Sequence, residues 1–227
     1  MEKQEIFSLL NGAVKMYRSR YNPTSDAVWL AALPYEAPKT VLDVGIGSGG
    51  VALCLQHHFP QSHITGLDIS DDMLNICRQN IQLNNCDIEL LKQDILEWST
   101  TRTFDLVISN PPYFTGTPTT KNPAAHHNTD LTKWIKRCIA RVRPHGYFCT
   151  IVDAARLTDV TSAMSKTCGD ITIIPLFGTK NTAERVLVRC RTCSNGPCTI
   201  YKSLPMNCDS ILRTGLTIRN FLSNISA

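Results

Sequence analysis

From Thr40 onward, short apolar runs alternate with longer stretches in which apolar residues recur every three or four positions. Short runs of this kind are typical of buried strands, and the longer pattern is typical of amphipathic helices. The expected strands are TVLDVG, HITGLDI, DIELLK, FDLVIS, YFCTIV, ITIIPL and RVLVRC. The expected helices are GVALCLQHHF, DDMLNICRQNIQL, Leu131–Val142 and Ala154–Cys168. This alternation predicts an α/β fold, with a mostly parallel sheet of about seven strands and helices on both faces.

The residues before the first of these strands predict helices. Ile6–Tyr17 has apolar residues at helical spacing. Ala27–Leu33 predicts a short helix that Ser25 or Asp26 caps and Pro34 ends.

The length of the chain predicts one domain over residues 1–227. Within it we expect a helical flank at 1–39, a catalytic core at 40–191 and a C-terminal extension at 192–227. In the extension, Ser210–Leu222 predicts either a strand or a helix.

Composition and charge limit the class of protein and the partners that can be expected. Hydrophobic residues make up 43% of the chain and charged residues 19%, as is typical of a globular protein. The net charge of +4 is spread along the chain, so it permits a local basic patch without indicating a nucleic-acid partner. Glu2, Lys3 and Glu5 interrupt any apolar run at the N-terminus, and no later run has the length of a membrane span. We therefore expect a cytoplasmic protein with no membrane partner.

The ten cysteines are expected to be reduced thiols, because the residues near the N-terminus predict no secretion signal. Cys190, Cys193 and Cys198 lie close together in CRTCSNGPC, which resembles a metal knuckle. The second CxxC of a zinc ribbon is missing, so the pattern favours thiols without a metal ion.

A glycine loop, DVGIGSGG, lies between the first core strand and its helix. Gly45, Gly47 and Gly50 satisfy the GxGxxG pattern of dinucleotide-binding proteins, whereas Gly45, Gly47 and Gly49 satisfy the GxGxG pattern of S-adenosylmethionine enzymes. Asp68 ends the second strand, where a carboxylate binds ribose hydroxyls in either cofactor. The loop and this carboxylate alone therefore leave both cofactors open.

Other carboxylates favour S-adenosylmethionine. Asp94 follows the third strand and is placed to reach an adenine amino group, with Ile95 beside the ring, and Ile69 after the second strand belongs to the same expected site. Asp43 directly precedes the loop, where it can engage the methionyl ammonium and would repel a pyrophosphate. The alternative for Asp94 is a solvated acid or a helix cap for ILEW.

The fourth strand, FDLVIS, stops abruptly at NPPY. The Asn110 side-chain oxygen and the Pro111 carbonyl can accept both hydrogens of a planar amine, which turns the lone pair of its nitrogen out of conjugation. Pro111 and Pro112 restrict the backbone around these acceptors, and Tyr113 offers a face for stacking. The alternative is a rigid loop that merely closes the strand.

VLDVGIGSGG, GLDIS, KQDI and FDLVISNPPY resemble successive motifs of class I S-adenosylmethionine-dependent methyltransferases, in the amino-methylating branch with an NPPY signature. The resemblance implies a Rossmann-like fold and S-adenosylmethionine as cofactor. DAVWLAALP, NPPYFTGTPT, AAHHNTDLTKWI and KNTAERVLVRC further resemble bacterial adenine-N6 methyltransferases that act beside the anticodon of a valine tRNA. We therefore expect tRNA or another structured RNA as partner. The candidate RNA contacts are Lys15, Arg18, Arg20, His126, Lys180 and Arg185.

Other interpretations remain open. The same chemistry serves adenine in rRNA or DNA and the glutamine amide of release factors. Release-factor enzymes usually carry a separate N-terminal helical domain, for which about 40 residues before the first strand are too few. A catalytically silent S-adenosylmethionine-binding or RNA-binding module is a further alternative, which the intact Asn110, Asp68 and Asp94 disfavour.

Overall fold

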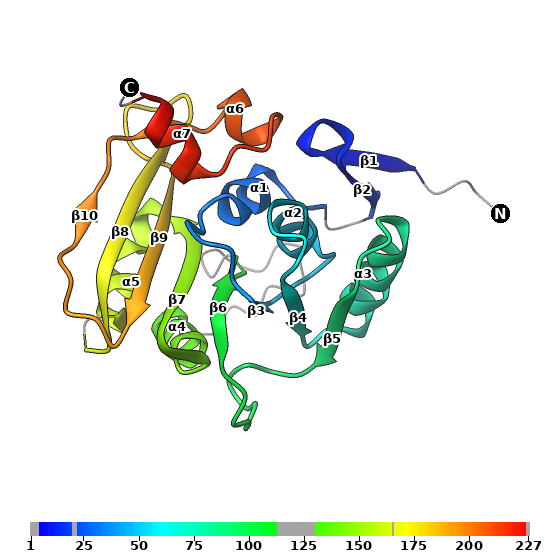
Figure 1. Ribbon diagram of the computed structural model, residues 1–227, viewed down its shortest axis with the longest axis horizontal. Coiled ribbons are helices and arrows are strands. Elements are labelled where there is room, and N and C mark those ends of the chain that lie inside the picture. Colours follow the sequence, from blue (N-terminus) through cyan, green and yellow to red (C-terminus); the bar gives the residue numbers. More distant parts are fainter. Residues whose placement is uncertain (1–4, 20–21, 113–129, 165, 226–227) are drawn as a thin grey trace.

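A computed structural model describes residues 5–19, 22–112, 130–164 and 166–225. The core is a nine-stranded sheet in the order β10-β8-β9-β7-β6-β3-β4-β5, with β11 beside β8 (Figure 1). The main strands are β3 (Thr40–Val44), β4 (His63–Asp68), β5 (Ile88–Lys92), β6 (Phe104–Ser109), β7 (Val142–Asp153), β8 (Cys168–Phe177) and β9 (Arg185–Thr192). These seven strands confirm those expected. The short β10 (Thr199–Ile200) and β11 (Leu204–Pro205) were not expected.

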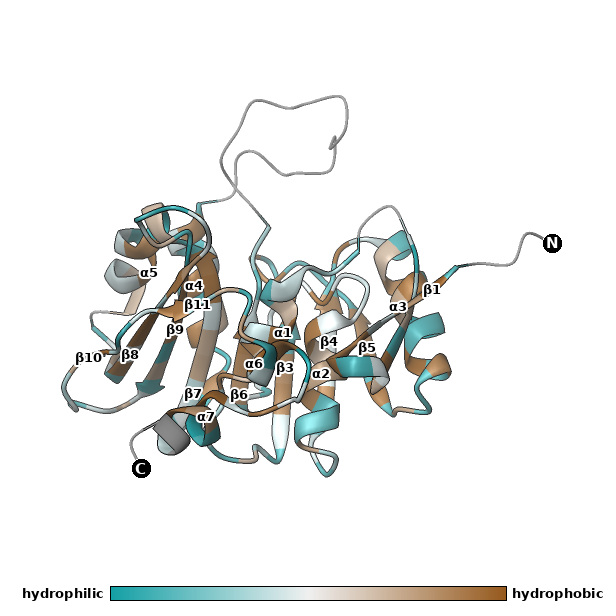
Figure 2. Cartoon of the chain, turned by 90° about the horizontal axis from the view of Figure 1, so that it is seen from above, coloured by the Kyte–Doolittle hydropathy of each residue, from teal (hydrophilic) through white to brown (hydrophobic). Residues whose placement is uncertain are grey.

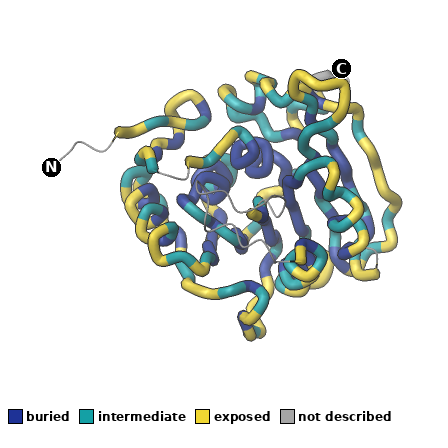
Figure 3. Tube along the Cα trace, turned by 180° about the vertical axis from the view of Figure 1, so that it is seen from behind, coloured by how far each residue is buried: buried dark blue, intermediate teal, exposed yellow. Residues whose placement is uncertain are grey.

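Helices cover both faces of the sheet, as expected (Figure 2). One apolar layer packs the sheet against α1 (Ser25–Ala31), α2 (Gly50–His58) and α3 (Asp71–Leu83). The other packs it against α4 (Leu131–Ile139) and α5 (Leu157–Met164). The central strands β3, β4 and β6 are buried along most of their length, whereas in β5, at one edge of the sheet, only Ile88 is buried (Figure 3). None of the described helices is long and apolar enough to cross a membrane.

The helix expected over Ile6–Tyr17 is wrong. This segment forms an antiparallel hairpin of β1 (Ile6–Leu9) and β2 (Val14–Tyr17), joined by a 3₁₀ turn (Leu10–Gly12). Leu10, Asn11 and Gly12 all have positive φ angles, of 50°, 52° and 98°. Asn-Gly favours such a turn, and β2 alternates buried and exposed side chains as a half-buried strand does. The spacing of the apolar residues fits both a helix and a strand, and packing of the segment against α3 selects the strand.

The other helix predictions are confirmed with small changes. α1 spans Ser25–Ala31, but its cap is Thr24, whose side chain accepts a hydrogen bond from the Asp26 backbone N–H at 3.4 Å. Neither Ser25 nor Asp26 is therefore the cap. The segment Ser210–Leu222 is mostly helical, with α6 (Asp209–Leu212) followed by α7 (Ile218–Ile225).

The order of the strands indicates where the sheet would bind a ligand. β3 pairs in parallel with β4 on one side and with β6 on the other. The order of the strands in the sheet therefore reverses at β3. Ligands of open α/β sheets bind at such a switch point, outside the carboxyl ends of the strands. Asp43, Asp68 and Asn110 lie at or next to the carboxyl ends of these three strands.

Candidate active site

The glycine loop carries the chain from β3 into α2. Gly45, Gly47 and Gly49 have φ angles of 74°, 55° and 92°, in a left-handed region that residues other than glycine rarely adopt. Gly50 instead begins α2, and a Cβ there would lie 2.6 Å from the Cβ of Pro23. Backbone conformation thus requires glycine at the three GxGxG positions, and packing requires it at the fourth. Each pattern thus accounts for one glycine that the other omits: GxGxG for the left-handed Gly49, and GxGxxG for the closely packed Gly50.

Asp68 closes the loop from the neighbouring strand. Its two carboxylate oxygens accept hydrogen bonds of 2.9 Å, one from the backbone N–H of Gly47 and the other from that of Ser70. The next residue, Ile69, is 43% exposed, although it is large and apolar. A carboxylate at the loop and an open apolar side chain beside it suit a ribose and an attached flat ring.

Asp43 lies beneath the loop and is 1% exposed. The backbone N–H of Ala52 donates a hydrogen bond to its carboxylate, but among the described residues Oδ2 has no partner. Burial, and then the nearby charge of Asp68, raise the pKa of Asp43 to about 7. A buried carboxylate oxygen without a donor is costly, so it suits a ligand cation such as a methionyl ammonium.

Asp94 serves as a turn cap, in agreement with the alternative interpretation of its sequence. Its Oδ1 accepts a hydrogen bond of 2.8 Å from the Leu96 N–H, and its carbonyl accepts one of 2.7 Å from the Trp98 N–H. Ile95 is 2% exposed and packs into the core against α4. The adenine contacts of Asp94 and Ile95 stay predictions, and the buried side chain of Ile95 offers no open face to a ring.

Asn110 directly follows a residue whose side chain is held by two hydrogen bonds. Ser109 is fully buried, and its Oγ donates a hydrogen bond of 2.8 Å to the carbonyl oxygen of Val44. The same Oγ accepts one of 3.1 Å from the indole Nε1 of Trp134 in α4. The end of β6 is therefore tied to the end of β3, where the glycine loop begins. Asn110 is half-buried at this junction.

The remainder of NPPY is only partly described. Pro111 is buried and Pro112 is exposed, whereas Tyr113 lies outside the described residues. Trp134 is a site residue that the sequence analysis missed. Its indole would lie 3.5 Å from a Cβ placed on Gly45. Its position in AAHHNTDLTKWI, a segment singled out only for its resemblance, was the available signal.

The family model for the methyltransferase small domain matches residues 21–174. The chain belongs to this family.

Two curated methyltransferases are similar over parts of their length. A release factor glutamine methyltransferase from Deinococcus radiodurans is 34% identical over 115 residues, which are 48% of this chain and 41% of that protein. A tRNA1(Val) (adenine(37)-N6)-methyltransferase from Bacteroides thetaiotaomicron is 30% identical over 151 residues, 63% of this chain and 64% of that protein. The chain thus spans less than two thirds of either relative.

Solved structures share the fold. A protein from Agrobacterium tumefaciens, described as a predicted O-methyltransferase, aligns with a TM-score of 0.67 over 80% of this chain and 88% of its own. Sequence identity is 21%, so the likeness shows the fold alone. It confirms the expected Rossmann-like class I methyltransferase architecture.

The candidate RNA contacts of this methyltransferase small domain protein are scattered. Lys15 and Lys180 are exposed, and Arg18 forms an ion pair of 3.0 Å with Glu5. Arg20 and His126 lie outside the described residues. The structure does not gather the described candidates into one patch, because Lys15 and Arg18 belong to the hairpin and Lys180 to the loop between β8 and β9.

Arg185 contacts carboxylates. Its Nε lies 3.0 Å from an oxygen of the buried Asp26, and its Nη1 pairs with Asp153. These partners come from α1 and from the end of β7. Arg185 therefore ties three elements of the methyltransferase domain together, and its expected phosphate contact stays a prediction that these ion pairs disfavour.

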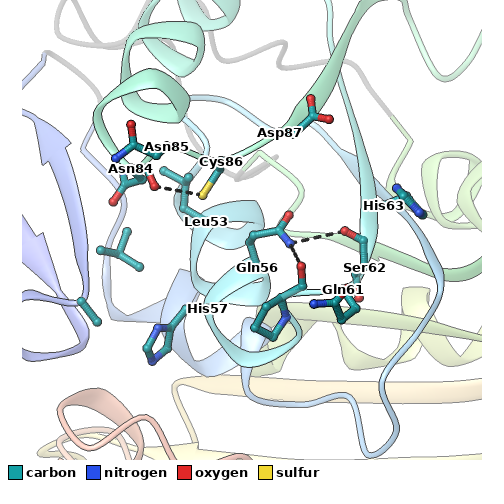
Figure 4. A pocket seen from close by; sticks show the side chains of 13 residues that line it. Leu53, Gln56, His57, Gln61, Ser62, His63, Asn84, Asn85, Cys86 and Asp87 are labelled. Atoms are coloured by element: carbon teal, nitrogen blue, oxygen red, sulfur yellow. Dashed lines mark hydrogen bonds between the residues drawn. The ribbon is translucent and has the colours of Figure 1, made fainter.

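A cavity of about 490 Å³ lies at the opposite edge of the domain (Figure 4). Its walls include Gln56 and His57 at the end of α2, Ser62 and His63 at the start of β4, and Asn84 after α3. The amino ends of the strands face it, so it is separate from the glycine loop and Asn110. It plays no part in the candidate active site.

Proposed function

We propose that this chain is an S-adenosylmethionine-dependent methyltransferase that modifies N6 of adenine in tRNA. The observation that carries the proposal is the position of Asn110 and Pro111, next to a glycine loop with three left-handed glycines. Family membership and the similarity to an adenine-N6 tRNA methyltransferase support it.

The residues that would bind the cofactor lie at the carboxyl ends of the strands. Gly45, Gly47 and Gly49 allow close approach of a ligand to the backbone. Asp43 offers the ammonium of the cofactor an oxygen that has no partner among the described residues. Asp68 and Ile69 would hold the ribose and pack against the adenine ring. When bound, S-adenosylmethionine supplies an electrophilic methyl group.

Asn110 and Pro111 would prepare the nucleophile. The nitrogen of adenine N6 is a poor nucleophile, because its lone pair is delocalised into the ring. When the Asn110 side-chain oxygen and the Pro111 carbonyl oxygen accept its two N–H hydrogens, the amine moves towards tetrahedral geometry. No strong base is needed, since the nitrogen becomes acidic only once it is alkylated. Alignment of this kind contributes up to ~7–11 kcal/mol in model systems.

Rigidity around Asn110 supports this role. Proline restricts its own φ and keeps the preceding residue extended, so both acceptors are aimed before a substrate arrives. The Ser109 hydrogen bonds to Val44 and Trp134 fix the start of this segment relative to the glycine loop. An unpaired base would have to leave its loop to enter the site, with Tyr113 as the expected stacking face.

The test uses purified protein, labelled S-adenosylmethionine and unmodified tRNA transcripts, followed by nucleoside analysis. The expected product is N6-methyladenosine. Label that is found only in protein would contradict the proposal.

A second candidate substrate is a release-factor glutamine. The similarity to a release factor glutamine methyltransferase favours it, and a carboxamide presents the same planar NH2 group to Asn110. Purified release factor is therefore included in the same assay. Methylated glutamine without methylated adenine would select this candidate.

A further inference from the structure

Asn80 is a fully buried polar residue near the C-terminal end of α3. Its Nδ2 donates a hydrogen bond of 2.9 Å to the carbonyl oxygen of Ser48, inside the glycine loop. Its Oδ1 accepts a hydrogen bond of 2.8 Å from the backbone N–H of Tyr17, in β2. One side chain thus joins the N-terminal hairpin to the loop that begins α2, and the hairpin lies beside α3 in Figure 1.

The orientation of this amide is determined by its partners. The Tyr17 N–H is a donor, so it requires the oxygen of the amide on the hairpin side. The Ser48 carbonyl is an acceptor, so it requires the nitrogen on the loop side. Burial makes the alternative orientation costly, because both pairs of groups would then be mismatched away from water.

The loop needs such a contact because its backbone is intrinsically permissive. Ser48 lies between Gly47 and Gly49, and glycine loses more conformational freedom on folding than any other residue. The same face of α3 also supports the next residue of the loop. A Cβ on Gly49 would lie 2.9 Å from the sulfur of Cys77, which is buried one turn before Asn80.

We propose that Asn80 is a positioning residue for the cofactor loop, which holds the Ser48 carbonyl so that the loop keeps one shape for S-adenosylmethionine. The inference rests on the proposed function, because it concerns the cofactor of the same site. It assigns Asn80 no contact with the reacting atoms. Its loss therefore weakens cofactor binding much more than it slows methyl transfer.

Asn84 provides a matched control one turn further along the chain. Its Oδ1 accepts a hydrogen bond of 2.9 Å from the Lys15 N–H, and its Nδ2 donates to the carbonyls of Lys15 and Asn80. It therefore holds the same hairpin strand against the same side of α3. Its hydrogen bonds go to these backbone groups and leave the Ser48 carbonyl untouched.

The experiment compares Asn80→Asp, Asn80→Ala and Asn84→Ala with the unchanged protein. Asn80→Asp keeps the acceptor for Tyr17 but replaces the donor to Ser48 with an oxygen. Calorimetry measures the Kd of S-adenosylhomocysteine, and kinetics give KM for S-adenosylmethionine and kcat at saturation. For Asn80→Asp we expect Kd and KM to rise at least about tenfold, with kcat within about threefold. For Asn84→Ala we expect Kd within about twofold.

Thermal unfolding of each variant separates a local effect from a folding defect. If Asn80→Asp does not fold, Asn80→Ala, which buries no charge, is judged by the same thresholds. Equal losses of affinity in Asn80 and Asn84 variants, or unchanged affinity in the Asn80 variants, overturn the inference alone. If the unchanged protein does not bind S-adenosylhomocysteine, the proposed function fails, and the inference fails with it.

Discussion

At the scale of single residues, Asn110 is the side chain on which the proposed chemistry depends. Asn110→Ala removes the side-chain acceptor and leaves the backbone path of the Pro-Pro segment. Because this contact strengthens only as the amine changes geometry, we expect kcat to fall at least about a hundredfold. KM for S-adenosylmethionine should change little. Asn207→Ala, which truncates an exposed asparagine, is the control. Steady-state kinetics on tRNA decide. An unchanged kcat would contradict the role proposed for Asn110, whereas no turnover by the unchanged protein would support the catalytically silent alternative.

Asp43 gives a second prediction at this scale, in the pH dependence of binding. Its folded pKa of about 7 is raised above the ordinary value of 3.8 for this side chain, so the free native protein holds this proton up to about pH 7. An incoming ammonium favours the ionised carboxylate, so binding releases the proton below that pH. Affinity for S-adenosylhomocysteine should therefore rise between about pH 5.5 and pH 7.5. Calorimetry across this range should show a flat profile for Asp43→Asn. A parallel rise in the variant would assign the effect to another group.

The same pKa affects stability with a definite sign. Because the folded pKa lies above the ordinary value of 3.8, the native state binds this proton more tightly than the unfolded chain does. That contribution to folding is complete below about pH 3.8 and is lost progressively as the pH rises from there to about 7. The unliganded protein should therefore gain stability from Asp43→Asn mainly at neutral and higher pH.

At the scale of elements, the N-terminal hairpin shows what local pattern leaves undecided. The apolar residues of this segment fit a helix, whereas β2 alone fits a strand, and the Asn-Gly pair supplies the turn. Buried Val14 and Met16 pack into the layer beneath α2 and α3. Asn80 of α3 and Asn84, which directly follows α3, then hold the β2 backbone. These partners lie more than 60 residues away in sequence, so no short window contains them.

Arg185 joins β9 to α1 and β7, so its substitution tests how these elements are held together. Arg185→Gln leaves the carboxylate of Asp26 buried with a weaker partner. Removing one member of a buried ion pair typically costs 3–5 kcal/mol, and the partial exposure of Arg185 reduces this to about 2 kcal/mol or more. Denaturant unfolding measures the loss. Lys180→Gln, in the exposed loop before β9, should leave stability unchanged. Equal stability of the two variants would argue that Arg185 is available to RNA.

At the scale of the whole molecule, the carboxyl ends of three strands, β3, β4 and β6, meet at the candidate site. A ligand that binds only the folded protein stabilises it by mass action, by about 2.7 kcal/mol at a hundred times its Kd. For a chain of this size, S-adenosylhomocysteine should then raise Tm by roughly 5–10 °C. NAD is the control, because the glycine loop also satisfies the dinucleotide pattern. A rise with NAD and none with S-adenosylhomocysteine would reverse the choice of cofactor.

The sequence by itself determined the seven main strands, the glycine loop with its following carboxylates, and the class of methyltransferase motifs. These features are set by short-range spacing, because strand period, glycine requirement and proline restriction all act within a few residues. Only the tertiary structure decided that Trp134 contacts Ser109, that Arg185 pairs with Asp26, and that Asn80 supports Ser48. Each of these contacts joins elements far apart in the chain. Their physical cause is the packing of α1, α3 and α4 around one sheet, where a buried polar group must find its partner in whichever element lies beside it.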